Sequence, residues 1–185
     1  MKTFFKLSAC AIGATFFSAA AMAITIERSV SVQATITDPS ATFQVDAVSG
    51  SWPVTPSVVN WNESTKTFRN PNKIGFKVKS AQDVTVALSS SAVLVDSQKE
   101  IPLNISVTAS DTAKGTSAPT VNLLPAVIYE SGKNAAGEFT TYELGIEAST
   151  SNMKDGTGTV ITGANATPAA GNYVGSVDLI FESNI

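Results

Sequence analysis

The chain has 185 residues, 12 of them basic and 15 acidic, with a formal net charge of −3 and no histidine. The missing histidine excludes Ser-His-Asp and Cys-His nucleophilic machinery and histidine-based metal sites. A mildly acidic chain without a basic patch argues against nucleic acid as a partner. We therefore expect a protein that is not an enzyme, with no catalytic residues, cofactor or metal.

The first 23 residues have the pattern of a secretory signal peptide. Lys2 and Lys6 form a basic start, residues 7–20 are mostly apolar, and small residues end at Ala23. This pattern predicts export and cleavage between Ala23 and Ile24. The remaining 162 residues suit one domain with a hydrophobic core.

Cleavage at this position removes the one cysteine of the chain, Cys10. An exported domain without cysteine has no disulfide framework. Its stability must therefore come from burial of apolar side chains and from pairing with other chains.

Residues 24–37, ITIERSVSVQATIT, alternate between apolar and polar side chains and predict one long strand with a single apolar face. Asp38-Pro39 ends it, because proline lacks a ladder donor and favours extended backbone before it. No turn signal joins this strand to the next one as a hairpin. It therefore needs a groove to bury its apolar face, which is formed by Ile24, Ile26, Val30, Val32, Ala34 and Ile36.

The rest of the chain predicts short strands separated by Gly, Pro, Asn and Ser. No stretch of ten residues has a sustained helical period, so the fold class is an all-β sandwich. Residues 121–129 are apolar on both faces and predict a central strand or a short helix, with Pro125 favouring a bulge or an edge. The other strands are expected over residues 41–48, 58–61, 66–68, 73–79, 84–88, 92–95, 101–109, 139–146 and 172–182.

Two tryptophans leave a second function open. Trp52 and Trp61 flank a proline-containing loop and are either core residues or a platform that stacks on a sugar ring. The second interpretation describes a secreted or periplasmic carbohydrate-binding β-sandwich, whose N-terminal strand folds into its own groove. Asp155-Gly-Thr-Gly predicts a hairpin turn, because a phosphate or calcium loop needs further residues that do not follow it.

Both ends of the exported chain resemble a known family. Residues 26–32 (IERSVSV), followed by Asp38-Pro39, resemble the start of major pilins of the colonization factor antigen I family, the alpha clade of chaperone–usher fimbriae. Residues 61–68 (WNESTKTF) and 101–107 (IPLNISV) are similar to internal segments of that family. Residues 170–181 (AGNYVGSVDLIF) are similar to its final strand.

The resemblance implies the major structural subunit of a bacterial surface fimbria for adhesion, exported through the periplasm. Its fold would be an incomplete immunoglobulin-like sandwich over residues 38–185, completed by donor-strand exchange. A periplasmic chaperone would fill the groove first, and residues 24–37 of the next identical subunit would then replace it, head to tail. An outer-membrane usher would assemble the fibre, and a tip adhesin is a further partner.

The resemblance also assigns roles to residues. The donor-strand positions are Ile24, Ile26, Val30, Val32, Ala34 and Ile36. The final strand would form the groove and face the chaperone through Tyr173, Gly175, Val177, Leu179 and Phe181.

Overall fold

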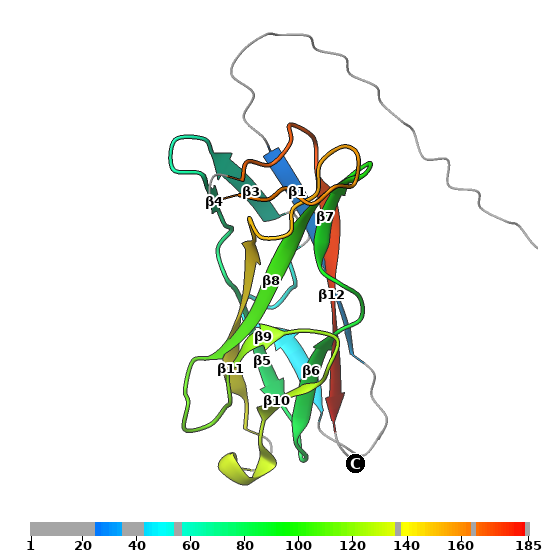
Figure 1. The fold of residues 1–185 in the computed structure, drawn as a ribbon. Helices are drawn as coiled ribbons and strands as arrows, with labels where there is room; N and C mark the ends of the chain where they lie inside the picture. The colour runs from blue at the N-terminus through cyan, green and yellow to red at the C-terminus, as the bar shows by residue number, and fades with distance from the viewer. Residues whose placement is uncertain (1–24, 35–42, 54–56, 136–137, 164–165, 184–185) are drawn as a thin grey trace, which may run out of the picture.

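The computed structural model describes residues 25–34, 43–53, 57–135, 138–163 and 166–183, the first of these ranges by its backbone. These residues form twelve β-strands and one three-residue 3-10 helix (Figure 1). In the same described part of the chain, no helix has the length and apolar character needed to cross a membrane. The expected all-β fold class is confirmed.

The observed strands follow the expected segments closely, apart from β9, which begins before any expected strand, and residues 121–129. Alternating side chains produce them, as in β5, where every second residue is buried. The elements are β1 (Thr25–Ala34), β2 (Gln44–Ala47), β3 (Ser57–Asn62), β4 (Thr67–Arg69), β5 (Ile74–Lys79), β6 (Val84–Leu88), β7 (Val93–Asp96), β8 (Lys99–Ala109), β9 (Ala118–Val121), β10 (Ala126–Tyr129), η1 (Ser131–Lys133), β11 (Thr140–Ala148) and β12 (Val174–Ser183).

Residues 121–129 form neither a single strand nor a helix, so that prediction is wrong. β9 ends at Val121 and β10 begins at Ala126. Between them, the Leu124 amide donates to Asn122 Oδ1 at 2.7 Å, which closes a turn before Pro125. Apolar residues on both faces concealed this turn, because a run of them carries no periodic signal for an interruption.

The strands form two layers that share β8. One layer has the order β2-β5-β11-β8 with β9 beside β8, and the other has β10-β6-β12-β1-β3-β4. The long strand β8 pairs with β11 in the first layer and with β7 in the second. The orders β2-β5-β11-β8 and β6-β12 match the A-B-E-D and C-F orders of an immunoglobulin-like sandwich.

Aromatic side chains join the two layers in the core. Phe76 of β5 stacks on Tyr142 of β11 with ring centroids 5.3 Å apart. Phe76 also meets Phe181 of β12 edge to face at 5.5 Å. All three residues are fully buried. Because Phe181 belongs to the opposite layer, this cluster holds β12 against the first sheet.

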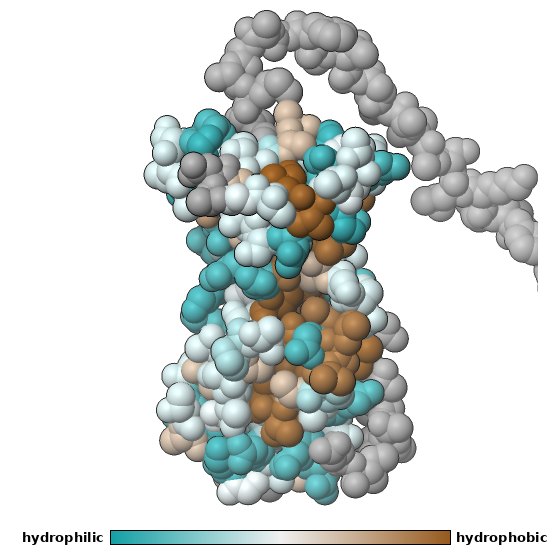
Figure 2. Space-filling model, viewed as in Figure 1, coloured by the Kyte–Doolittle hydropathy of each residue, from teal (hydrophilic) through white to brown (hydrophobic). Residues whose placement is uncertain are grey.

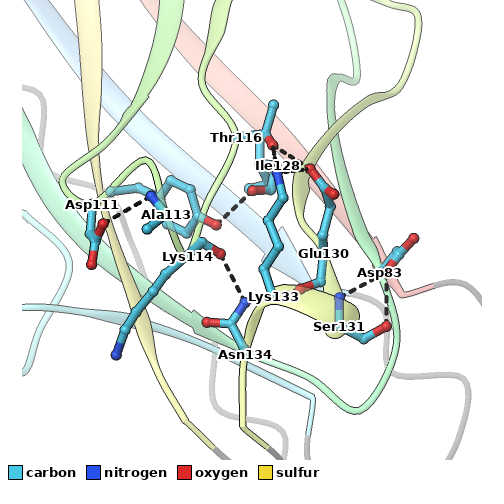
Figure 3. A network of polar contacts seen from close by, with 11 residues as sticks. Asp83, Asp111, Ala113, Lys114, Thr116, Ile128, Glu130, Ser131, Lys133 and Asn134 are labelled. Carbon is cyan, nitrogen blue, oxygen red and sulfur yellow. Dashed lines mark hydrogen bonds and ion pairs between the residues drawn. The ribbon is translucent and has the colours of Figure 1, made fainter.

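A polar network closes the end of the sandwich near β10 and η1 (Figure 3). Glu130 Oε1 accepts hydrogen bonds from Lys133 Nζ at 2.7 Å and from Thr116 Oγ1 at 2.5 Å. Asn134 Nδ2 donates to the carbonyl oxygens of Lys114 and Glu130 at 2.8 and 3.0 Å. The hydrogen bond from Lys133, followed by that from Thr116, holds the pKa of the Glu130 carboxyl below its ordinary value.

The lowered pKa of Glu130 predicts an acid-sensitive contribution to stability. This contribution is present above the unfolded-state pKa and is lost as the pH falls through the lower folded-state pKa. We expect Glu130→Gln to lower the free energy of unfolding at pH 7 and to narrow its difference between pH 7 and pH 3. Urea unfolding at both pH values measures this. Glu147→Gln, at an exposed carboxyl of β11, should leave the difference as in the unsubstituted protein.

Candidate functional site

The candidate site is the strand position beside β12 in the second layer. On one side, β12 pairs antiparallel with β6, from Leu179↔Leu88 to Ser183↔Val84. On its other side it pairs parallel with β1, in the register Glu27↔Val174 to Ala34↔Phe181. The strand position is therefore filled by the N-terminal strand of the same chain (Figure 1).

β1 also has a partner on its second edge. It pairs antiparallel with β3, from Thr25↔Asn60 to Arg28↔Ser57. The expected strand over residues 24–37 thus exists over Thr25–Ala34, and Ile24 and Ile36 lie outside the described residues. So does the cleavage position between Ala23 and Ile24.

The register places the apolar positions of β1 opposite buried residues of its partners. Val177, Leu179 and Phe181 of β12 are at most 1% exposed, and Val59 of β3 is fully buried. A slip by one residue would place polar positions opposite all four. The paired positions are Val30↔Val177, Val32↔Leu179, Ala34↔Phe181 and Ile26↔Val59.

The five residues named on the final strand lie together along β12 and just before it. Tyr173, Val177, Leu179 and Phe181 are buried, whereas Val174 on the other face is half exposed. Gly175 is needed because β7 comes very close: a Cβ atom here would lie 2.3 Å from the carbonyl oxygen of Val93.

Two contacts fix the point at which β12 begins. The Tyr173 hydroxyl donates to the carbonyl oxygen of Ala169 at 2.7 Å, which is the tyrosine corner of immunoglobulin-like strands F. Asp96 Oδ2 accepts hydrogen bonds from Lys99 Nζ at 2.9 Å and from the Asn172 amide at 3.2 Å. The hydrogen bond from Lys99 lowers the pKa of Asp96, and burial raises the pKa of Tyr173 to about 12.

Sequence reasoning did not find this anchor. Asp96 and Lys99 flank the turn between β7 and β8, and Lys99 Nζ also donates to the carbonyl oxygen of Ala170 at 2.7 Å. The partners are separated by more than 70 residues along the chain. An Asp and a Lys three residues apart are the only local signal, and that spacing is common in turns.

The tryptophans have separate partners. Trp52 packs against the core, with its ring centroid 6.1 Å from that of Phe76. Trp61 meets Phe68 edge to face at 4.9 Å, and its Nε1 donates to Glu63 at 2.7 Å. Trp52 is therefore a partly buried residue packed against the core, as one interpretation expected, whereas Trp61 is not among the residues that pack against it.

The structure also tests the expected turn at Asp155. Asp155 Oδ1 accepts hydrogen bonds from the amides of Thr157 and Thr159 at 2.8 and 3.0 Å, which confirms the predicted turn. Within the described ranges, no three Asp or Glu side chains are grouped so that they could hold a metal ion. The arrangement beside β12 offers backbone hydrogen-bonding groups and apolar side chains, which are suited to binding an extended strand.

Comparison with known proteins gives one match to a family. The family model described as CS1 type fimbrial major subunit matches residues 26–182. The match begins within β1 and ends within β12, so it includes nearly all of both strands of the candidate site. A search of the curated proteins finds no match to the chain.

The close approach at Gly175 predicts a strong effect of a single methyl group. Gly175→Ala places a Cβ against backbone, which must shift, so we expect a loss of roughly 1–3 kcal/mol in the free energy of unfolding. Gly132→Ala is the control, because its Cβ meets nothing within 4 Å. Chemical denaturation measures both variants. Equal stability of the two would show that β7 does not restrict β12.

Proposed function

The chain belongs to the family of CS1 type fimbrial major subunits, and from this membership we propose that it polymerises by donor-strand exchange. The family makes the protein a structural subunit of a surface fimbria. In the proposed assembly, residues 24–37 of one copy bind beside β12 of the next copy, head to tail, and complete its immunoglobulin-like sandwich.

The observation that carries this proposal is the register of β1 on β12. An extended strand fits beside β12 over eight consecutive residue pairs, with apolar positions opposite Val177, Leu179 and Phe181. Without a strand there, the backbone groups on one edge of β12 and on one edge of β3 would have no strand partner. The buried side chains of β12 would also lose the strand that lies beside them. A strand from another copy satisfies the same groups by β-augmentation.

Strand direction gives a reason for exchange. The chain's own β1 runs parallel to β12. Parallel pairing is slightly less stable per residue than antiparallel pairing. A donor strand from another copy is not bound by the connection to β2, so it is free to run antiparallel. Exchange can therefore replace a weaker ladder by a stronger one.

The rest of the assembly route is part of the same proposal. Residues 1–23 direct export and are removed between Ala23 and Ile24. A periplasmic chaperone protects the groove along Tyr173, Gly175, Val177, Leu179 and Phe181 until an outer-membrane usher brings in the donor strand. The finished fimbria stands on the bacterial surface, where it serves adhesion with a tip adhesin as partner.

The alternative function, a carbohydrate-binding module, would keep β1 permanently in its own chain. That arrangement occurs in the structure of the single chain. The sugar platform has little support, because Trp52 packs against Phe76 of the core and the Trp61 ring already contacts Phe68. Family membership favours the fimbrial subunit.

Donor-strand exchange predicts that fibre formation depends on the N-terminal strand. A variant whose exported chain starts at Ala41, co-expressed with chaperone and usher, should form no fibres because it has no strand to donate. Electron microscopy of the cell surface measures this. Fibres made of the truncated chain would contradict the proposal.

A peptide experiment separates strand binding from export. A synthetic peptide of residues 24–37 should bind the chain that starts at Ala41. Val32→Asp in the peptide should reduce affinity at least tenfold, because in either strand direction it places a charge on the apolar face that covers buried residues of β12. Gln33→Asp is the matched control and should bind as the unsubstituted peptide does. Calorimetric titration gives the affinities.

A further inference from the structure

Two adjacent leucines protrude from the turn between β9 and β10. Leu123 is 57% exposed and Leu124 is 75% exposed. Val127 of β10 is also exposed nearby in sequence. Figure 2 shows apolar side chains gathered on the face of the molecule that carries β8 and β9. We call residues 122–125 the leucine turn.

Hydrogen bonds hold the leucine turn in place. Its Asn122 side chain accepts the Leu124 amide at 2.7 Å, and the Leu88 amide of β6 donates to the Asn122 carbonyl oxygen at 2.7 Å. The two leucines are therefore presented to water by an ordered turn. Neighbouring exposed apolar residues mark interaction surfaces, and an ordered turn reduces the entropy lost on binding.

The occupant we consider is a neighbouring copy in the fibre, whose symmetry restricts the contact, and this step rests on the proposed function. In a head-to-tail fibre all copies point in the same direction, so no two-fold axis relates them. A surface of one copy then cannot pair with the same surface of another, and the contact must be heterologous. The leucine turn needs a different apolar surface on the same chain.

Among the grooves formed by the described residues, one meets this requirement. It has a volume of about 470 Å³, lies where β2 ends and β5 begins, and is lined by Val48, Pro71, Ile74 and Gly75, among others. Val48 is 55% exposed. Lys73, the charged residue of this groove, is paired with Glu143 at 3.2 Å, so its charge is already compensated. We call it the Val48 groove.

The other two grooves described fit less well. A groove of about 340 Å³ is lined largely by polar residues such as Thr150, Ser151 and Asn152, whose groups leucines would leave unpaired. A groove of about 390 Å³ between residues 88–93 and 120–123 includes Leu123 itself. It belongs to the same surface as the leucine turn.

We propose that the leucine turn of one copy inserts into the Val48 groove of another copy in the fimbria. This contact is separate from the strand position beside β12 and joins the side surfaces of the subunits. It buries the two exposed leucines and gives the fibre contacts beyond those of the donor strand.

Disulfide trapping in assembled fibres tests the contact. Leu124→Cys and Val48→Cys are introduced into separate copies that are co-expressed, in a chain whose exported part has no other cysteine. A disulfide needs Cα atoms about 4.4–6.8 Å apart. Oxidation should give a cross-linked dimer on a non-reducing denaturing gel. Leu124→Cys with Val160→Cys, 42% exposed in the polar groove, is the control and should give none.

The outcomes separate the two proposals. If unsubstituted fibres do not form, donor-strand assembly fails and this contact fails with it. If fibres form but the Val48 pair gives no more dimer than the Val160 pair, the contact alone is overturned.

A double-mutant cycle keeps the test decisive if the cysteines prevent assembly. Leu124→Ser and Val48→Ser should each lower the urea midpoint of fibre dissociation. The combined variant should lower it no further than the larger single effect, because both changes remove one contact. Additive effects would overturn the proposal.

Discussion

The structure depends on satisfying the backbone edge of β12. This strand runs through the second layer and contributes Phe181 to the aromatic cluster that joins the two sheets. One of its backbone edges pairs antiparallel with β6 of the same layer. Its other edge is closed by β1, which comes from the far end of the chain and runs parallel to it. Buried backbone groups require such a partner, whichever chain supplies it.

The parts of the molecule around this edge are held firmly. Tyr173 and the Asp96–Lys99 pair fix the start of β12, and Gly175 lets β7 approach it closely. In the opposite layer, the stacked rings of Phe76 and Tyr142 join β5 to β11. A preformed edge with a fixed register lowers the cost of binding a strand, because little has to be ordered when the strand arrives. The same rigidity suits the position both to the chain's own β1 and to a strand from another copy.

A structural subunit of a fimbria works through association, and the features of this chain agree with that role. The strand position beside β12 offers backbone hydrogen-bonding groups and apolar side chains for association. The chain contains no histidine. The strand position would determine the direction of a fibre. The leucine turn and the Val48 groove lie on separate elements, β9–β10 and β2–β5, so they would act between subunits without competing for that position.

Local patterns were sufficient to predict much of the fold. The two-residue period of residues 24–37 and 172–182 predicted β1 and β12, and the missing helical period predicted an all-β sandwich. The period also predicted which side of β12 is buried. These properties follow from the geometry of an extended backbone, in which alternate side chains point to opposite faces.

Pairing, by contrast, was decided by the tertiary structure. The contact of the Asn122 carbonyl with the Leu88 amide, the parallel register of β1 on β12 and the contact of Lys99 with Ala170 join residues far apart in the chain. An alternating strand shows that it needs a partner but carries no local mark of which edge it will meet or in which direction. The amino-acid sequence thus determined the strands and their faces. The folded sandwich determined their neighbours, because only there do distant backbone edges come within hydrogen-bonding distance.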